Sequence, residues 1–140
     1  MKVKVLDGGF LPERAHFDDA GLDFKTPETF TLEPHGGWHV VDLKVSVQIP
    51  IGYFGKMESK SGLMVKHGIV CKGGVIDSGF RGSMMDRMQN DGDEPYTFKR
   101  GDKLVEMVLQ PVLLADIEKV EELDPSASGR DESRLGSTGK

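Results

Sequence analysis

The clearest alternation of apolar and polar residues in this chain lies at Val41-Asp42-Leu43-Lys44-Val45-Ser46-Val47-Gln48-Ile49. An apolar residue stands at every second position, and side chains alternate between the two faces of a strand. The apolar side chains therefore share one face, which predicts a half-buried β-strand over the whole range. Pro50 and Gly52 interrupt the pattern, because neither residue continues a central strand well.

Shorter apolar runs predict further strands on the C-terminal side of this stretch. They lie at 69–71, 75–76 and 104–114 and alternate with turn sequences at Gly73-Gly74 and Asn90-Asp91-Gly92. The apolar residues of 117–123 suit either a helix or a strand. With 18 glycines and only 7% aromatic residues, the chain is predicted to be an all-β antiparallel sandwich or jelly roll.

Composition argues against several classes of protein. The 140 residues fit one domain, and no run approaches the ~20 apolar residues that span a bilayer, so no membrane partner is expected. Acidic residues outnumber basic ones by 23 to 18, and the net charge of -5 disfavours nucleic-acid binding. The four scattered histidines and the single cysteine predict neither a zinc site nor an internal disulfide. With no apolar run long enough for a signal peptide, the prediction is a cytoplasmic protein.

Residues 1–125 and 126–140 differ in composition. After Pro125 the chain is rich in serine, glycine and charged residues, and it contains one large apolar residue, Leu135. A segment with so little apolar surface cannot build a core. We therefore expect a β domain over 1–125 and a flexible C-terminal arm over 126–140. The ending Gly136-Ser137-Thr138-Gly139-Lys140 lacks the spacing of a nucleotide-binding phosphate loop.

Two internal segments are candidates for binding chemistry. Ser59-Lys60-Ser61-Gly62-Leu63-Met64-Val65 predicts a short helix capped by Ser59 or Ser61, and its free N–H groups and Lys60 could hold phosphates. An ordinary capped turn is the commoner meaning of such a sequence. In Gly73-Gly74-Val75-Ile76-Asp77-Ser78-Gly79-Phe80-Arg81-Gly82, an apolar strand enters a turn with Asp77 at its mouth. Such a hairpin could read a flat base with its main-chain edge, unless Asp77 only hydrogen-bonds its own turn.

Five short motifs follow one another along nearly the whole chain. They read Ala20-Gly21-Leu22-Asp23-Phe24, Ser59-Lys60-Ser61-Gly62-Leu63 continuing to Lys66-His67-Gly68, Gly74-Val75-Ile76-Asp77 through Phe80-Arg81-Gly82, Gly101-Asp102-Lys103-Leu104-Val105-Glu106-Met107-Val108, and Arg130 with Leu135-Gly136-Ser137-Thr138-Gly139. Any one of them is a weak signal. All five in this order resemble the trimeric dUTP pyrophosphatase (dUTPase) family.

The resemblance implies a jelly-roll subunit of the β-clip type, a homotrimer, and hydrolysis of dUTP to dUMP and pyrophosphate with Mg2+ on the triphosphate. It implies that Asp77 is the general base that activates the attacking water. By the same resemblance, Asp23 belongs to the metal site and contacts the ion only through water. The matched substrate-binding positions are Lys60, Ser61 and Gly62 for the phosphates, Gly74, Val75, Ile76 and Met85 for uracil and deoxyribose, Phe80 for the sugar, and Arg130, Leu135 and Gly136 in the closing arm.

Four positions depart from the usual pattern of the family. Lys60 stands where the family usually has an arginine, so the two-pronged contact of a guanidinium group with phosphate is replaced by the single charge of an ammonium group. Phe80 replaces a tyrosine and keeps the ring. Glu106 replaces a glutamine, and Leu135 stands where a phenylalanine covers the base, although Arg134 could cover it by stacking.

Two alternatives remain at the level of sequence. The related dCTP deaminases carry a catalytic glutamate ten residues beyond the aspartate that matches Asp77, and here that position is Arg87. A cation cannot act as that general base, so deamination is disfavoured. The other alternative is a non-catalytic regulatory or interaction protein that keeps the fold and has lost turnover.

Overall fold

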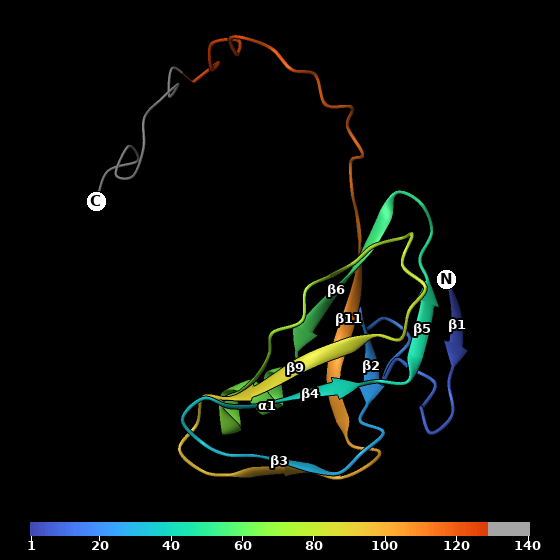
Figure 1. Ribbon diagram of the computed structural model, residues 1–140, viewed down its shortest axis with the longest axis vertical. Helices are drawn as coiled ribbons and strands as arrows, with labels where there is room; N and C mark the ends of the chain where they lie inside the picture. Colours follow the sequence, from blue (N-terminus) through green and yellow to red (C-terminus); the bar gives the residue numbers. More distant parts are fainter. Residues whose placement is uncertain (129–140) are drawn as a thin grey trace.

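The computed structural model describes residues 1–128 and shows a mostly β domain with one short helix (Figure 1), which confirms the predicted fold class. Within this described part, no helix is long and apolar enough to cross a membrane. The elements in chain order are β1 (Lys2–Val5), β2 (Gly21–Lys25), β3 (Phe30–Leu32), β4 (Gly37–Asp42), β5 (Val45–Gln48), β6 (Tyr53–Ser59), α1 (Ser61–His67), β7 (Ile69–Cys71), β8 (Val75–Ile76), β9 (Met85–Asn90), β10 (Tyr96–Phe98) and β11 (Lys103–Pro111).

Two antiparallel sheets contain most of the strands. The first has the strand order β2-β11-β6-β8 and the second the order β4-β9-β7. Two smaller pairs, β1 with β5 and β10 with β3, complete the domain. Buried side chains from both larger sheets, among them Met57 and Met107 from the first and Val41 and Met88 from the second, meet in one hydrophobic core.

The alternating stretch at 41–49 supplies one wall of this core. Its five apolar side chains are each 2% exposed or less, as the alternation predicts: Val41, Leu43, Val45, Val47 and Ile49. The expectation of one continuous strand was wrong, because β4 ends at Asp42 and β5 begins at Val45. The stripe of apolar residues therefore continues across two strands that belong to different sheets.

A tight local turn causes this break. The N–H of Lys44 donates to Oδ1 of Asp42 at 3.0 Å, and Lys44 takes a left-handed φ of 57°. The N–H of Leu43 donates to the carbonyl of Met84 at 2.9 Å, so that the turn is tied to the start of β9. An aspartate that bonds a backbone N–H two residues later offers the chain an alternative to the strand ladder.

Beyond β11 the chain leaves the domain. Figure 1 shows this segment, drawn in orange and red, running away from the sheets. No helix or strand is assigned from 112 to 128, so the ambiguous stretch at 117–123 forms neither. Several apolar side chains of residues 112–128 are largely exposed in the single chain, among them Leu113 at 88% and Ile117 at 99%.

We predict that Leu43→Ala lowers the free energy of unfolding by about 2–5 kcal/mol, because it leaves a cavity where β4 gives way to β5. Ser46→Ala, on the opposite face of the same stretch, is the matched control and should change it by less than about 0.5 kcal/mol. Urea denaturation at one fixed protein concentration measures both. Equal losses in the two variants would contradict the assignment of the apolar face.

Candidate functional site

The hairpin that starts at β8 presents a free main-chain edge. Within residues 1–128, β8 pairs only with β6, through the partners Gly55 with Ile76 and Lys56 with Val75. Its other edge is open, and a strand edge offers alternating N–H and C=O groups to an incoming partner. The residues predicted to read a base with their main chain, Gly74 to Ile76, therefore lie at a sheet edge where such contacts are possible.

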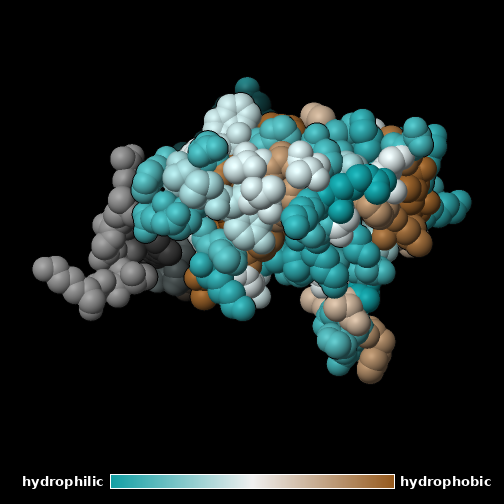
Figure 2. All heavy atoms as spheres, turned by 90° about the horizontal axis from the view of Figure 1, so that it is seen from below, coloured by the Kyte–Doolittle hydropathy of each residue, from teal (hydrophilic) through white to brown (hydrophobic). Residues whose placement is uncertain are grey.

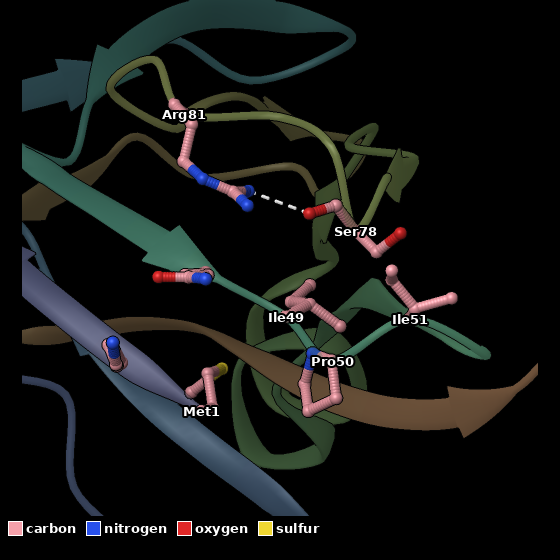
Figure 3. Close-up of a pocket in the computed structure, with 8 residues that line it drawn as sticks. Met1, Ile49, Pro50, Ile51, Ser78 and Arg81 are labelled. Atoms are coloured by element: carbon pink, nitrogen blue, oxygen red, sulfur yellow. Dashed lines mark hydrogen bonds between the residues drawn. The ribbon is translucent and has the colours of Figure 1, made fainter.

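Asp77 follows β8 directly and begins a turn that is held by the main chain. The N–H of Phe80 donates to the carbonyl of Asp77 at 3.1 Å. The guanidinium of Arg81 donates to the carbonyls of Ser78 and Phe80, both at 2.6 Å, and Figure 3 shows the contact with Ser78. These bonds close the turn without the Asp77 carboxylate, which remains exposed at its start.

The same turn separates two surface hollows. One, of about 240 Å³, is lined by Asp77, Ser78 and a set of apolar or aromatic residues, namely Tyr53, Phe54, Val75, Val112 and Leu114. The other, of about 450 Å³, has Ser78 and Arg81 on one side and the apolar wall of Met1, Ile49, Pro50 and Ile51 on the other (Figure 3). Asp77 thus stands beside apolar surface on the first side of the turn.

Phe80 and Met85 also lie at the surface near this turn. The ring of Phe80 is 41% exposed and rests on Gly82, where an added Cβ would come within 2.7 Å of the ring. Met85 begins β9 and is exposed. The aromatic face of Phe80 is therefore held in place on one side and accessible on the other.

A second group of predicted site residues surrounds the start of α1. The helix predicted near Ser59 is present, with Ser61 as its first residue and Gly62 as its second. The predicted cap was wrong, because Lys60 occupies the N-cap position without a side-chain cap bond. Ser59 instead accepts a hydrogen bond from the N–H of Cys71 at 2.9 Å and so ties the end of β6 to β7.

Asp23 is the buried centre of this second group. It is 5% exposed and accepts hydrogen bonds from the ammonium groups of Lys60 and Lys103, the latter at 2.6 Å. Lys60 also lies 3.8 Å from Glu106. Burial acts to raise the pKa of Asp23, but the hydrogen bonds from Lys103 and Lys60 outweigh it and lower the pKa below its usual 3.8. Asp23 is therefore ionised at neutral pH.

A bulge in β11 assembles these charges on one face. Lys103 pairs with Lys25 and Val105 with Phe24, so that Leu104 is one extra residue in β11. An extra residue shifts the alternation of side chains by one position. Lys103 and Glu106 therefore point to the same face, beside Asp23. Sequence reasoning missed Lys103, and a bulge leaves no clear signal in a hydrophobic pattern beyond the consecutive apolar residues Leu104 and Val105.

The two groups do not meet within one chain. Asp77 follows the part of β8 that pairs with the start of β6, whereas Lys60 follows the end of β6. Six residues of extended chain separate the two places, or about 20 Å at 3.3 Å per residue. Arg130, Leu135 and Gly136 lie outside the described residues, so the structure does not place them.

We predict that Asp23→Asn lowers the free energy of unfolding at pH 7 by about 1–3 kcal/mol, because two ammonium groups lose a charged hydrogen-bond acceptor. The folded pKa of Asp23 is depressed, so its contribution is present above about pH 4 and disappears as the pH falls through the folded value. Urea denaturation at pH 7 and in acid should show that the difference in the free energy of unfolding between Asp23→Asn and the parent protein shrinks in acid. Asp18→Asn, at an exposed carboxylate, is the control. A difference that persists unchanged in acid would contradict the ionic role.

Comparison with known proteins identifies the family. Residues 9–139 match the family model described as dUTPase. The deoxyuridine 5'-triphosphate nucleotidohydrolase of Debaryomyces hansenii is 39% identical over 93% of this chain and 81% of its own length, and that of Anaeromyxobacter sp. is 41% identical over 93% and 88%. The Staphylococcus bacteriophage 80alpha dUTPase with dUPNHPP has a TM-score of 0.88 at 30% identity, covering 99% of this chain and 98% of its own. A mutant dUTPase of phage phi11, described with a structural Mg(II) ion, has a TM-score of 0.80 at 30% identity over 86% and 96%. The chain therefore belongs to the dUTPase family.

Proposed function

We propose that this protein hydrolyses dUTP to dUMP and pyrophosphate, limiting the dUTP available for incorporation into DNA. The family match over residues 9–139 supports the activity. The observation in the structure that carries it is the hairpin at β8, where an open main-chain edge ends in an exposed carboxylate beside an apolar hollow. Such an arrangement can hold a base and place a water molecule against the adjoining phosphate.

In the proposed reaction Asp77 acts as the general base. Its carboxylate accepts a proton from water, the water oxygen forms a bond to the α-phosphorus, and the bond from that phosphorus to the α,β-bridging oxygen breaks. Pyrophosphate is the leaving group. The turn that bears Asp77 is fixed by Arg81 and by the Phe80 N–H, so the carboxylate is presented from a rigid support.

Recognition of the base and sugar is assigned to the same hairpin. We propose that the main chain at Gly74, Val75 and Ile76 pairs with uracil, and that Phe80 packs against the deoxyribose. A ring held on one side by Gly82 leaves little room for a 2'-hydroxyl, and that hydroxyl would also lose its hydrogen bonds to water. Met85 borders this surface at the start of β9.

The phosphates are assigned to the group around α1. Lys60, Ser61 and Gly62 offer an ammonium group, a hydroxyl and main-chain N–H groups in consecutive positions. Binding a phosphate requires Lys60 to loosen its contact with Asp23, whose charge Lys103 continues to neutralise.

Mg2+ fits this site as an ion carried by the substrate. The described residues contain no group of three or more His, Cys, Asp or Glu side chains able to hold a metal. Asp23 is already bonded to two ammonium groups, which suits a contact through water better than direct ligation. Bound to the triphosphate, the ion would neutralise negative charge and orient the leaving group.

We propose a homotrimer: the two halves of the site lie apart in one chain, which calls for a second subunit, and the resemblance to the trimeric dUTPases sets the number of subunits at three. The α-phosphorus and the terminal phosphate of one nucleotide are close neighbours, yet Asp77 and Lys60 are about 20 Å apart along β6. Asp77 of one subunit and Lys60 of another can meet across a subunit contact. The face in Figure 2 is mostly hydrophilic, with its largest hydrophobic patch at one end, and the chain after β11 exposes further apolar side chains that a neighbour could cover.

The two alternatives from sequence are distinguishable from this proposal. The guanidinium carbon of Arg87 lies 4.5 Å from the centre of the Trp38 ring, on the exposed face of β9. A guanidinium group cannot act as the general base that the glutamate of a deaminase supplies. A purely regulatory protein of this fold would release no pyrophosphate from dUTP. The assay of the unaltered protein with dUTP, dCTP, dTTP and UTP separates the three possibilities.

We predict that Asp77→Asn abolishes pyrophosphate release while the affinity for dUpNHpp stays within about tenfold of the parent protein, because an amide keeps the shape and cannot accept the proton. Calorimetry measures the affinity and a pyrophosphate assay the turnover. Asp93 is exposed in the loop between β9 and β10. Asp93→Asn is therefore the control for the loss of one negative charge. Turnover retained in Asp77→Asn would remove this residue from the role of base.

We also predict that two inactive variants restore each other. Lys60→Ala should lower kcat/KM by about 100-fold, as expected for loss of a phosphate contact. If it is unfolded, mixed in equal amounts with Asp77→Asn and refolded, about a quarter of the sites in random trimers will combine an intact Asp77 with an intact Lys60 from a neighbour. Activity should then rise to about that fraction of the parent value. No recovery, with mixed trimers confirmed by mass, would show that both residues act from one chain.

A further inference from the structure

Asp86 is a buried carboxylate that the proposed reaction does not use. It lies on β9 with its side chain toward the core and is 2% exposed. Neither carboxylate oxygen has a hydrogen-bond partner of good geometry within residues 1–128. Because burying a polar group without partners is costly, such a residue in a core calls for an explanation.

The carboxylate lies directly under Gly73. A Cβ added to Gly73 would come within 2.5 Å of Oδ2 and 2.8 Å of Oδ1 of Asp86. The pairing of β7 with β9 ends just before this point, where the N–H of Lys72 donates to the carbonyl of Arg87 at 2.8 Å. A residue larger than glycine at position 73 would therefore collide with the Asp86 carboxyl group.

Gly73 is also where the chain passes from one sheet to the other. Strand β7 belongs to the sheet with β9, whereas β8 belongs to the sheet with β6. The carbonyl of Gly74 already accepts a hydrogen bond from the N–H of Met57 on β6, at 3.2 Å. A displacement of the chain at Gly73 would therefore be passed directly to the edge formed by Gly74, Val75 and Ile76.

The groups around Asp86 give it no countercharge. Cys71 on β7 is the titratable group that faces it, and burial together with the Asp86 charge raises the pKa of that thiol. Glu58 on β6 acts on Cys71 in the same direction, while Lys72 and Arg87 are exposed. Burial raises the pKa of Asp86 to about 6, although the nearby main-chain N–H groups of Arg87 and Gly73 partly oppose this. The neutral acid is thus the form that suits the site.

We propose that Asp86 is a positioning residue for nucleotide binding: its neutral carboxyl group supports the chain at Gly73 and so fixes the position of the β8 edge that contacts the base. This inference rests on the proposed function of that edge. Ionisation of Asp86 puts an unpaired charge beneath Gly73, draws the Gly73 N–H toward it and shifts the β8 edge. Affinity for the nucleotide then falls, while the proton transfer at Asp77 is little affected, because the Phe80 N–H and Arg81 hold its turn separately.

The first test compares KM and kcat for dUTP in the parent protein, Asp86→Asn and the control Asp93→Asn, from about pH 5 to about pH 8. Ionisation of the substrate phosphates affects all three proteins equally, so ratios of KM isolate Asp86. Relative to Asp86→Asn, the KM of the parent and of the control should rise about tenfold across this range, with the kcat ratio constant. The same KM profile in all three proteins would overturn the inference. Absence of turnover in the parent protein would instead refute the proposed function.

The second test needs no change of pH. Gly73→Ala should raise KM about tenfold, because its methyl group collides with the Asp86 carboxyl group and displaces the chain. Removing the carboxyl group in the double variant Gly73→Ala with Asp86→Ala makes room for that methyl group and should recover much of the loss. If Asp86→Asn differs from the parent in circular dichroism, this double variant decides the question. If the change in KM of the double variant equals the product of the changes in Gly73→Ala and Asp86→Ala, the two positions are not coupled and the inference fails.

Discussion

Strand β11 is paired on both of its edges, and this double pairing fixes both the first sheet and the row of charges on its outer face. It joins β2 on one side and β6 on the other, and its residues Leu104, Val105 and Met107 are completely buried. The same register places Glu106 between Asp23 on β2 and Glu58 on β6. Three acidic side chains in adjacent strands repel one another unless cations lie among them. The ammonium groups of Lys60 and Lys103 supply this positive charge at Asp23.

Two aspartates in this domain show opposite solutions to burial. Asp23 keeps its charge because two ammonium groups reach it, and its pKa falls. Asp86 has no such partner, and its pKa rises to about 6. The difference follows from position: Asp23 lies on the outer face of its sheet, where long lysine side chains can reach it, whereas Asp86 points into the core. Burial alone would not have told the two apart.

The sequence predicted the fold class and the order of the motifs well, because both depend on local patterns. The alternation over 41–49 identified five core residues, and the helix near Ser59 is where it was expected. What sequence could not show depends on a local turn and on contacts between distant strands. The turn at Lys44 divides one pattern between two sheets, the bulge at Leu104 brings Lys103 beside Asp23, and the crossing at Gly73 sets that residue over Asp86. The predicted roles of the site residues themselves stay predictions.

The length of β6 has a consequence for assemblies that contain both normal and altered chains. In the proposed trimer each subunit contributes to two sites, because its two functional ends lie at opposite ends of β6, one near Asp77 and the other near Lys60. A lesion at one end disables one site for each defective chain, and its effect is diluted by healthy chains. A lesion that distorts β6 itself disables both sites that its chain serves. In trimers that mix normal and altered chains, a distorted β6 would therefore disable up to two sites for each altered chain, whereas a loss at either end would disable one.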